Sequence, residues 1–179
     1  MATQVIVLNG GSSSGKTGIA RCLQAILPQP WLRLGVDDLI EALPPSLLGD
    51  TAHDGIGFGP LGEVRVGDAF REVEGAWMAG LREMASAGAR IILDDVFLAG
   101  ADSQERTRGH LDGLDVLWVG VRCPATIAAD RELARGDRVR GMAAAQAETV
   151  HLRVSYDIEV DTSRLEAAEC ARSIADLVV

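Results

Sequence analysis

The segment Gly10–Thr17 constrains the possible fold more than any other part of this sequence. It reads GGSSSGKT, fits the pattern GxxxxGK[ST], and directly follows the apolar run Val5–Leu8. Between a strand and a helix, such a segment forms a loop whose backbone N–H groups surround phosphate oxygens at the positive end of the helix. Apolar residues recur at helical spacing from Ile19 to Leu27, so we expect that helix directly after the loop. The alternative, a glycine–serine turn without a ligand, leaves Lys16 unexplained.

The positions of this loop have distinct expected roles in holding a nucleotide. Lys16 is expected to reach the β and γ phosphates, and Thr17 to offer its hydroxyl group to magnesium. The other loop residues are expected to bind phosphate mainly through their backbone; they are Gly10, Gly11, Ser12, Ser13, Ser14 and Gly15. The motif therefore predicts that ATP and Mg²⁺ are the cofactors.

The length and composition favour a single, aliphatic α/β domain. A chain of 179 residues is expected to form one domain, 1–179, around one core. Hydrophobic residues make up 47% of the chain and aromatic residues only 4%, as in parallel sheets packed between helices. The net charge of −9 disfavours nucleic acid as a partner, because phosphate contacts require a broad positive field.

The cysteines and the apolar runs indicate the cellular compartment in which such a protein is expected. Its three cysteines include no CxxC pair, so neither a disulfide framework nor a zinc site is predicted, and a reducing cytoplasm is expected. No apolar run is long enough for a membrane span or a signal peptide, so no membrane association is expected. The sequence does not specify the oligomeric state, so both a monomer and a homo-oligomer are compatible with it.

Strands and helices are expected to alternate along the whole chain. The predicted strands are Val5–Asn9, Trp31–Val36, Arg90–Asp94, Val116–Val121 and Tyr156–Val160. The predicted helices are Lys16–Leu27, Asp38–Leu43, Asp68–Ala87, one from Asp102 to about Leu111 opened by an Asp102/Glu105 capping box, one ending near Arg135, Met142–Val150 and Leu165–Leu177. This alternation predicts a doubly wound α/β sheet of about five parallel strands with right-handed crossovers.

Acidic residues follow two of the predicted strands, where ligands bind in open parallel sheets. Asp37 follows the second strand and is expected to face the same crevice as the phosphate loop. Asp94 and Asp95 end the third strand, an arrangement typical of a Walker B segment, in which a carboxylate binds magnesium directly or through water. The alternative is that these acids cap helices. The sequence does not distinguish which of Asp94 and Asp95 is nearer the metal.

An arginine-rich segment, at about 131–142, interrupts this acidic chain. It contains Arg131, Arg135, Arg138 and Arg140 around Gly136, and suits a helical lid that closes over a nucleotide and brings guanidinium groups to the transferred phosphate. The alternative is a solvated helix face in which Glu132 and Asp137 are the partners of the arginines.

The segment at about 44–67 is rich in glycine and proline and is predicted to be mostly turns, with a short hairpin possible at Glu63–Val66. We interpret it as a cover on the substrate side. A tolerated surface insertion is the alternative.

Together these features predict a small kinase. Phosphoryl transfer requires the protein to hold donor and acceptor in line and to neutralise the charge on the moving group. Lys16, magnesium and one or two lid arginines could do so, while Asp37 accepts the proton of the acceptor hydroxyl or positions that hydroxyl. The NKxD motif of guanine-binding switch proteins is absent.

Several long runs resemble chloramphenicol phosphotransferase, a P-loop kinase family that inactivates the antibiotic. They read VLNGGSSSGKTGIARCLQ, WLRLGVDDLIEA, EGAWMAG, ARIILDDVFL, QERTRGHLDGLDVLWVGVRC, RELARGDRVRGMAA and YDIEVDT. The resemblance implies ATP-dependent phosphorylation of the primary, 3-position hydroxyl of chloramphenicol. It also implies Asp37 as catalytic base, Lys16 as phosphate-loop lysine, Arg135 and Arg138 as lid arginines, and a three-layer P-loop kinase fold with strand order 2-3-1-4-5.

Little of Pro44–Val66 shares in this resemblance. If that segment lines the acceptor pocket, the resemblance supports a kinase more strongly than it supports the antibiotic as acceptor. Two other functions therefore stay open: a kinase for another small hydroxyl-bearing metabolite, such as a nucleotide, a sugar or a shikimate-like compound, and a nucleotide-binding protein without catalytic activity.

Overall fold

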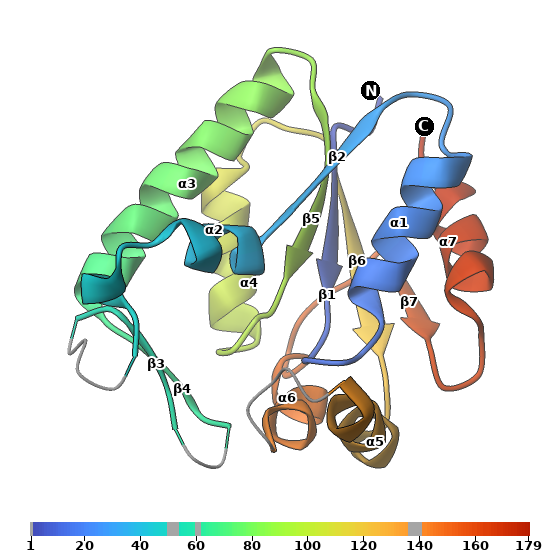
Figure 1. Ribbon diagram of the computed structural model, residues 1–179. Helices are drawn as coiled ribbons and strands as arrows, with labels where there is room; N and C mark the ends of the chain where they lie inside the picture. Colours follow the sequence, from blue (N-terminus) through green and yellow to red (C-terminus); the bar gives the residue numbers. More distant parts are fainter. Residues whose placement is uncertain (1, 50–53, 60–61, 136–140) are drawn as a thin grey trace.

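A parallel sheet forms the centre of the computed structural model, which describes all residues except 1, 50–53, 60–61 and 136–140 (Figure 1). The strands of this sheet are β1 (Val5–Asn9), β2 (Trp31–Gly35), β5 (Arg90–Asp95), β6 (Val116–Arg122) and β7 (Ile158–Asp161). All their pairings are parallel, and the order is β2-β5-β1-β6-β7. Numbered within this sheet alone, the order reads 2-3-1-4-5; the labels differ because β3 and β4 form a separate hairpin.

Helices cover both faces of the sheet, giving the three layers expected from the sequence. Alternate residues of β1 point to opposite faces, as the two-residue period of a strand requires. Ile6 and Leu8 pack toward α1 (Lys16–Ile26) and α7 (Ala167–Ala175). Val5 and Val7 pack in a second cluster with α3 (Asp68–Ser86), beside which lies α4 (Ala101–His110). The core is mostly aliphatic, as expected for a strand such as β1 that is buried on both faces.

The remaining elements lie toward the carboxyl ends of the strands. They are α2 (Val36–Ala42), the 3₁₀ turn Pro45–Leu47, β3 (Ile56–Phe58), β4 (Val64–Val66), α5 (Ala125–Arg135) and α6 (Met142–Thr149). Figure 1 shows the antiparallel β3–β4 hairpin, α5 and α6 at the end of the sheet toward which the strand arrows point. Among the described residues, no helix is both long and apolar enough to cross a lipid bilayer.

The structure corrects two details of the helices expected from the sequence. The predicted capping box of Asp102 and Glu105 does not form, because α4 begins one residue earlier, with Gly100 at its N-cap and both acids exposed. The helix after the second strand begins at Val36, two residues before the predicted start. The Asp38 carboxylate caps that helix by accepting a 2.7 Å hydrogen bond from the Gly35 N–H.

Candidate active site

The predicted phosphate loop joins β1 to α1 in a tight turn. Gly15 adopts a φ of 97°, in the left-handed region of backbone conformation that favours glycine. Ser13 lies in the same region, with a φ of 58°. A Cβ atom on Gly10 would lie 2.6 Å from the Val121 carbonyl oxygen, so a side chain cannot fit there. The Lys16 Nζ donates to the carbonyl oxygens of Gly10, at 2.8 Å, and Gly11, at 3.1 Å. The Lys16 side chain therefore folds back over the phosphate loop, where it is expected to bind phosphate.

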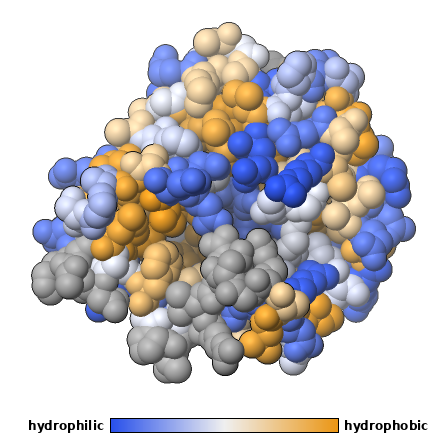
Figure 2. Space-filling view, in the orientation of Figure 1, coloured by the Kyte–Doolittle hydropathy of each residue, from blue (hydrophilic) through white to orange (hydrophobic). Residues whose placement is uncertain are grey.

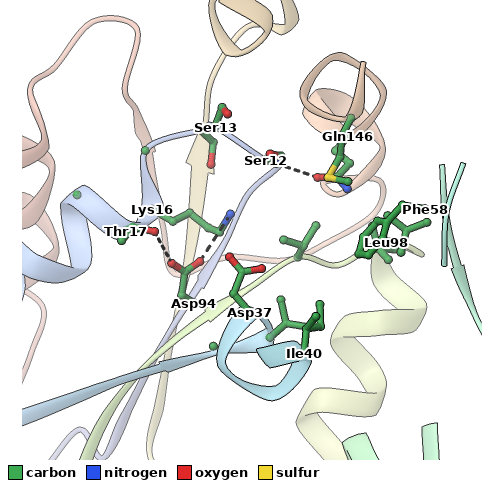
Figure 3. A pocket seen from close by; sticks show the side chains of 18 of the residues that line it. Ser12, Ser13, Lys16, Thr17, Asp37, Ile40, Phe58, Asp94, Leu98 and Gln146 are labelled. Atoms are coloured by element: carbon green, nitrogen blue, oxygen red, sulfur yellow. Dashed lines mark hydrogen bonds and ion pairs between the residues drawn. The ribbon is translucent and has the colours of Figure 1, made fainter. Parts of the chain in front are cut away.

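The register of β1 and β5 brings Asp94 to the loop. Leu8 pairs with Asp94, which places the acid beside the start of α1. The Thr17 Oγ1 donates a 3.0 Å hydrogen bond to Asp94 Oδ2, and Lys16 Nζ lies 3.6 Å from Asp94 Oδ1 (Figure 3). Two of the three residues predicted as magnesium ligands, Thr17 and Asp94, therefore lie in direct contact although they are distant in the sequence.

Asp95 is not part of this group, although it was predicted together with Asp94. Neighbouring strand residues project to opposite faces, and Asp95 faces the layer of α3 and α4. There it lines a small cavity of about 60 Å³ with Arg71, Glu74 and His110. The pKa of Asp95 is raised to about 6, mainly by burial and also by the nearby Glu74 carboxylate. The Val96 N–H, which donates to Asp95 Oδ1 at 2.7 Å, opposes this shift.

A cavity of about 360 Å³ opens beside the phosphate loop. Asp37, in the first turn of α2, lines this cavity, and its carboxylate points toward the loop (Figure 3). The expectation that Asp37 faces the crevice of the loop is thus met. Much of the remaining lining is apolar; these residues are Val36, Ile40, Ile56, Phe58, Val64, Val96, Leu98 and Met142. Figure 2 shows hydrophobic and hydrophilic residues meeting around the hollow in this face of the molecule.

The segment 44–67 forms part of this lining. Ile56 and Phe58 of β3 and Val64 of β4 all line the cavity, and Arg65 pairs with Gly57 in the hairpin register. The described part of the segment is therefore not a surface insertion remote from the site. Trp31, by contrast, packs in the core beneath α1 and does not line the cavity.

A second cavity, of about 420 Å³, lies on the other flank of the loop. It is lined by Ser13, Gly15 and Gly18 on one side and by Arg131 and Thr162 on the other. The Arg131 guanidinium donates to Thr162 Oγ1 at 3.0 Å and to the Thr162 carbonyl at 2.8 Å, and Thr162 Oγ1 donates to the Ser14 carbonyl at 2.7 Å. Arg131 thus supports the loop through Thr162 from the wall of this cavity. No sequence motif indicated that Thr162 contacts the loop.

The proposed arginine-rich lid is only partly described. Arg138, Arg140 and Asp137 lie outside the described residues, and Arg135 is the last residue of α5. Glu132 does not act as the solvated partner that the alternative interpretation required. It is 3% exposed, and its carboxylate accepts hydrogen bonds from the N–H groups of Gly141, at 2.7 Å, and Ala143, at 2.8 Å, so it caps α6.

Gln146 is a site residue that the sequence analysis missed. Its Oε1 accepts a 2.8 Å hydrogen bond from the Ser12 N–H of the phosphate loop (Figure 3). A single glutamine within the alanine-rich α6 carries no recognisable pattern, and 134 residues separate it from Ser12.

A buried polar network lies under the loop at the end of β1. The Asn9 Nδ2 donates to the Val150 carbonyl at 2.8 Å and to the Tyr156 hydroxyl at 2.6 Å, while Asn9 Oδ1 accepts from the Phe97 N–H at 2.9 Å. His151 Nδ1 lies 2.6 Å from the same hydroxyl. Burial lowers the pKa of His151 to about 4 and raises the pKa of Tyr156 to about 12. His151 is therefore a buried, structural member of this network.

Comparison with known proteins places this geometry in a family. The sequence profile described as "Chloramphenicol phosphotransferase-like protein" matches residues 3–179. A Mycobacterium tuberculosis H37Rv protein named "Putative O-phosphotransferase Rv2636" is 30% identical over 189 residues, which cover 96% of this chain and 80% of the relative.

Two solved structures show the same fold. A sugar kinase from Janibacter sp. HTCC2649 superposes with a TM-score of 0.68 at 19% identity, over 98% of this chain and 95% of the kinase. The APS kinase CysC of Mycobacterium tuberculosis, solved with AMPPNP and APS, superposes with a TM-score of 0.64 at 16% identity, over 98% of this chain and 97% of the kinase.

Proposed function

Because this chain belongs to the chloramphenicol phosphotransferase-like family of P-loop kinases, we propose that it transfers the γ-phosphoryl group of ATP to the hydroxyl group of a small, largely apolar alcohol. The primary, 3-position hydroxyl of chloramphenicol is the first candidate. The observation that carries this proposal is the position of Asp37, which faces the phosphate loop across a cavity large enough for such an acceptor.

The wall of the cavity supports a mainly apolar acceptor. Apolar side chains exclude water and favour aromatic or aliphatic groups, while a few polar groups orient the ligand. Arg33 also lines the cavity, but its guanidinium lies 3.8 Å from Asp38, which offsets its charge. A densely charged acceptor, such as a sugar phosphate, would lose solvation against Phe58 and Leu98. For this reason we rank charged metabolites below neutral alcohols.

The transfer step uses residues on both sides of the acceptor. The acceptor oxygen attacks the γ-phosphorus, and the bond between that phosphorus and the β–γ bridging oxygen breaks. The hydroxyl proton passes to the Asp37 carboxylate, and ADP leaves with the electron pair of the broken bond. Lys16 neutralises charge on the β and γ phosphates as the phosphoryl group moves. In-line alignment is the main contribution of the site.

Thr17 and Asp94 fit the requirements of a magnesium site. Mg²⁺ prefers oxygen ligands and is commonly held by one or two side chains together with substrate phosphates and water. The hydroxyl and the carboxylate already lie 3.0 Å apart beside the loop. The described residues contain no group of three or more His, Cys, Asp or Glu residues that could hold a metal ion, so the phosphates would supply further ligands. A bound Mg²⁺ would neutralise phosphate charge and orient the terminal phosphate.

The nucleoside is expected in the second cavity, between Arg131 and the phosphate loop. From there the phosphates cross the loop toward Asp37, because Ser13, Gly15 and Gly18 line both cavities. Arg135 and Arg138 are proposed to reach the transferred phosphoryl group from the lid, as guanidinium groups bind phosphate oxygens in a bidentate manner.

A direct assay tests the proposed function. The purified protein is incubated with Mg-ATP and chloramphenicol, in parallel with a sugar, a nucleoside and shikimate, and products are identified by mass spectrometry. A phosphorylated chloramphenicol supports the proposal. Phosphorylation of another acceptor would support a different metabolite kinase. ATP binding without transfer to any acceptor in this panel, together with no effect of Asp37→Ala on ATP turnover, would favour a non-catalytic nucleotide-binding protein.

A further inference from the structure

Gln146 is a buried polar side chain that none of the roles above explains. It is 6% exposed, and it lines the Asp37 cavity. Its orientation is set by its partner: the Ser12 N–H can only donate, so the carboxamide oxygen must face it. The carboxamide nitrogen is then directed elsewhere, and among the described residues none accepts a hydrogen bond from Nε2. Gln146 therefore presents an unused donor at the cavity.

The position of Ser12 indicates which phosphate this donor would meet. Ser13, Gly15 and Gly18 line both cavities, whereas Ser12 lines only the cavity that contains Asp37. If the nucleoside occupies the other cavity, Ser12 lies at the end of the loop nearest the terminal phosphate. Figure 3 shows Gln146 extending from α6 toward this end of the loop.

The helix that carries Gln146 is held at both ends. The buried Glu132 carboxylate accepts two N–H groups at the start of α6, and Asn9 donates to the carbonyl of Val150, the residue that caps the end of α6. A donor fixed before substrate binds loses little free energy in reorganisation when charge develops on the transferred group. The surroundings of Gln146 therefore suit a preorganised donor better than an adaptable surface residue.

We infer that Gln146 is a further catalytic residue: its Nε2 donates a hydrogen bond to an oxygen of the γ-phosphoryl group during transfer, while Oε1 stays on the Ser12 N–H. The inference rests on the proposed kinase function. A neutral amide suits this position, because it stabilises developing charge on the phosphoryl group and needs no counter-ion of its own. Mutation of one such donor commonly costs about 10²-fold or more in kcat.

Gln146→Glu separates this role from a purely structural one. Glutamate keeps an oxygen acceptor for the Ser12 N–H but replaces the amide donor by an anionic oxygen. If Gln146 only shapes the loop, Gln146→Glu binds and turns over ATP as the wild type does. If Nε2 meets the γ-phosphoryl group, we expect ADP affinity to stay within about twofold, ATP affinity to fall about tenfold or more, and kcat to fall about a hundredfold.

Gln146→Glu both removes the amide donor and adds a negative charge, and a neutral variant separates these two effects. Gln146→Met has a similar length but neither donor nor acceptor, and we expect it to lower kcat about tenfold or more and to reduce the preference for ATP over ADP. Gln24→Glu is the matched control, because it makes the same change on an exposed part of α1, where Gln24 donates to the Trp31 carbonyl. Thermal melting identifies any variant that fails to fold.

ATP and ADP binding, measured by calorimetry without any acceptor, keeps this inference distinct from the proposed function. If the wild type binds neither nucleotide, the proposed function is wrong. If the wild type binds both and folded Gln146→Glu shows the wild-type ratio of ATP to ADP affinity, the role assigned to Gln146 is wrong, whatever the acceptor proves to be. A selective loss of ATP affinity in both Gln146 variants, with Gln24→Glu unchanged, supports it.

Discussion

Thr17 Oγ1 donates a 3.0 Å hydrogen bond to Asp94 Oδ2, joining residues 77 positions apart in the chain. The bond links the first turn of α1 to the carboxyl end of β5, which are neighbours because β1 and β5 pair in parallel. Two oxygen atoms of the kind that Mg²⁺ prefers thus meet beside the phosphate loop. The proposed magnesium site follows from the sheet register rather than from a local motif.

Asp94→Asn is expected to impair the metal-dependent step far more than Asp95→Asn. Asp94 contacts Thr17 and Lys16, whereas Asp95 faces the cavity between α3 and α4. We expect Asp94→Asn to raise the Mg²⁺ concentration needed for half-maximal activity by about tenfold or more, the usual scale for a lost metal-site contact. Asp95→Asn is the matched control and should leave that concentration nearly unchanged. Equal effects of both substitutions would contradict the assignment.

Asp37→Asn is expected to lower kcat by about a hundredfold or more while nearly preserving ATP affinity. Asparagine keeps the shape of the side chain but cannot accept the acceptor's proton. The measurement is steady-state kinetics with the acceptor identified by the product assay, together with ATP binding by calorimetry. Asp38→Asn, one residue away in the same helix, serves as the control for a change of charge. A parallel loss of nucleotide affinity in Asp37→Asn would argue against a role as base.

Phe58→Ala is expected to raise KM for the acceptor and leave KM for ATP within about twofold. Phe58 lines the acceptor cavity and not the cavity proposed for the nucleoside. Loss of an apolar contact of this size corresponds to about 1–3 kcal/mol, or roughly 10- to 200-fold in acceptor recognition. Leu177→Ala, at an exposed position near the C-terminus, is the control. If KM for ATP rose instead, the two cavities would have been assigned the wrong ligands.

Glu132→Ala is expected to destabilise the protein by about 2 kcal/mol, since it leaves two N–H groups at the start of α6 without their acceptor. The measurement is the free energy of unfolding from urea titration. Glu148→Ala, at an exposed position of the same helix, is the control and should change that free energy by less than about 0.5 kcal/mol. A similar small effect for both variants would show that Glu132 does not hold α6.

Stability is expected to fall between about pH 6.5 and pH 4 partly because of His151. The pKa of this histidine is lowered to about 4 in the folded protein from its ordinary value of 6.5, first by burial and then by Arg122 and Lys16; Glu159 opposes the shift, and the Tyr156 hydroxyl faces the ring. In this interval the unfolded chain binds more protons than the folded one, so acidification favours unfolding.

The measurement that checks this pH effect is the melting temperature of the wild type and of His151→Gln between pH 4 and 8. The variant should show a smaller fall toward low pH than the wild type. His110→Gln removes a histidine elsewhere and is the control. Parallel curves for the wild type and His151→Gln would exclude His151 as a source of the pH dependence.

The local parts of the fold could be predicted because short segments specify them. Gly10–Thr17 specifies a phosphate loop through its glycines and its lysine, and the apolar runs specify buried strands. The helix predicted at Asp68–Ala87 is observed at Asp68–Ser86, because its amphipathic pattern and the following Gly88 mark its length and end. Where the local signal was ambiguous, the prediction was wrong: the Asp102 and Glu105 pair suggested a capping box, but Gly100 is the N-cap of α4.

The parts of the site that could not be predicted depend on distant contacts. Asp94 and Asp95 are equivalent in sequence, and only strand register and face separate them. Gln146 and Thr162 carry no motif, yet they contact Ser12 and Ser14 of the loop. Arg131 belonged to the predicted lid on the basis of charge alone, but its hydrogen bonds to Thr162 hold it beside the loop, in the lining of the second cavity.

By itself, the amino-acid sequence determined that this chain folds as an α/β P-loop protein, with a phosphate loop between the first strand and helix and with Asp37 directly after the second strand, because these features arise from residues close together in the chain. Only the tertiary structure decided that Asp94 rather than Asp95 meets Thr17, that the β3–β4 hairpin forms a wall of the acceptor cavity, and that Gln146 reaches Ser12. The physical reason is that side-chain direction and contact between remote segments are set by sheet register and helix packing, which no short stretch of sequence encodes.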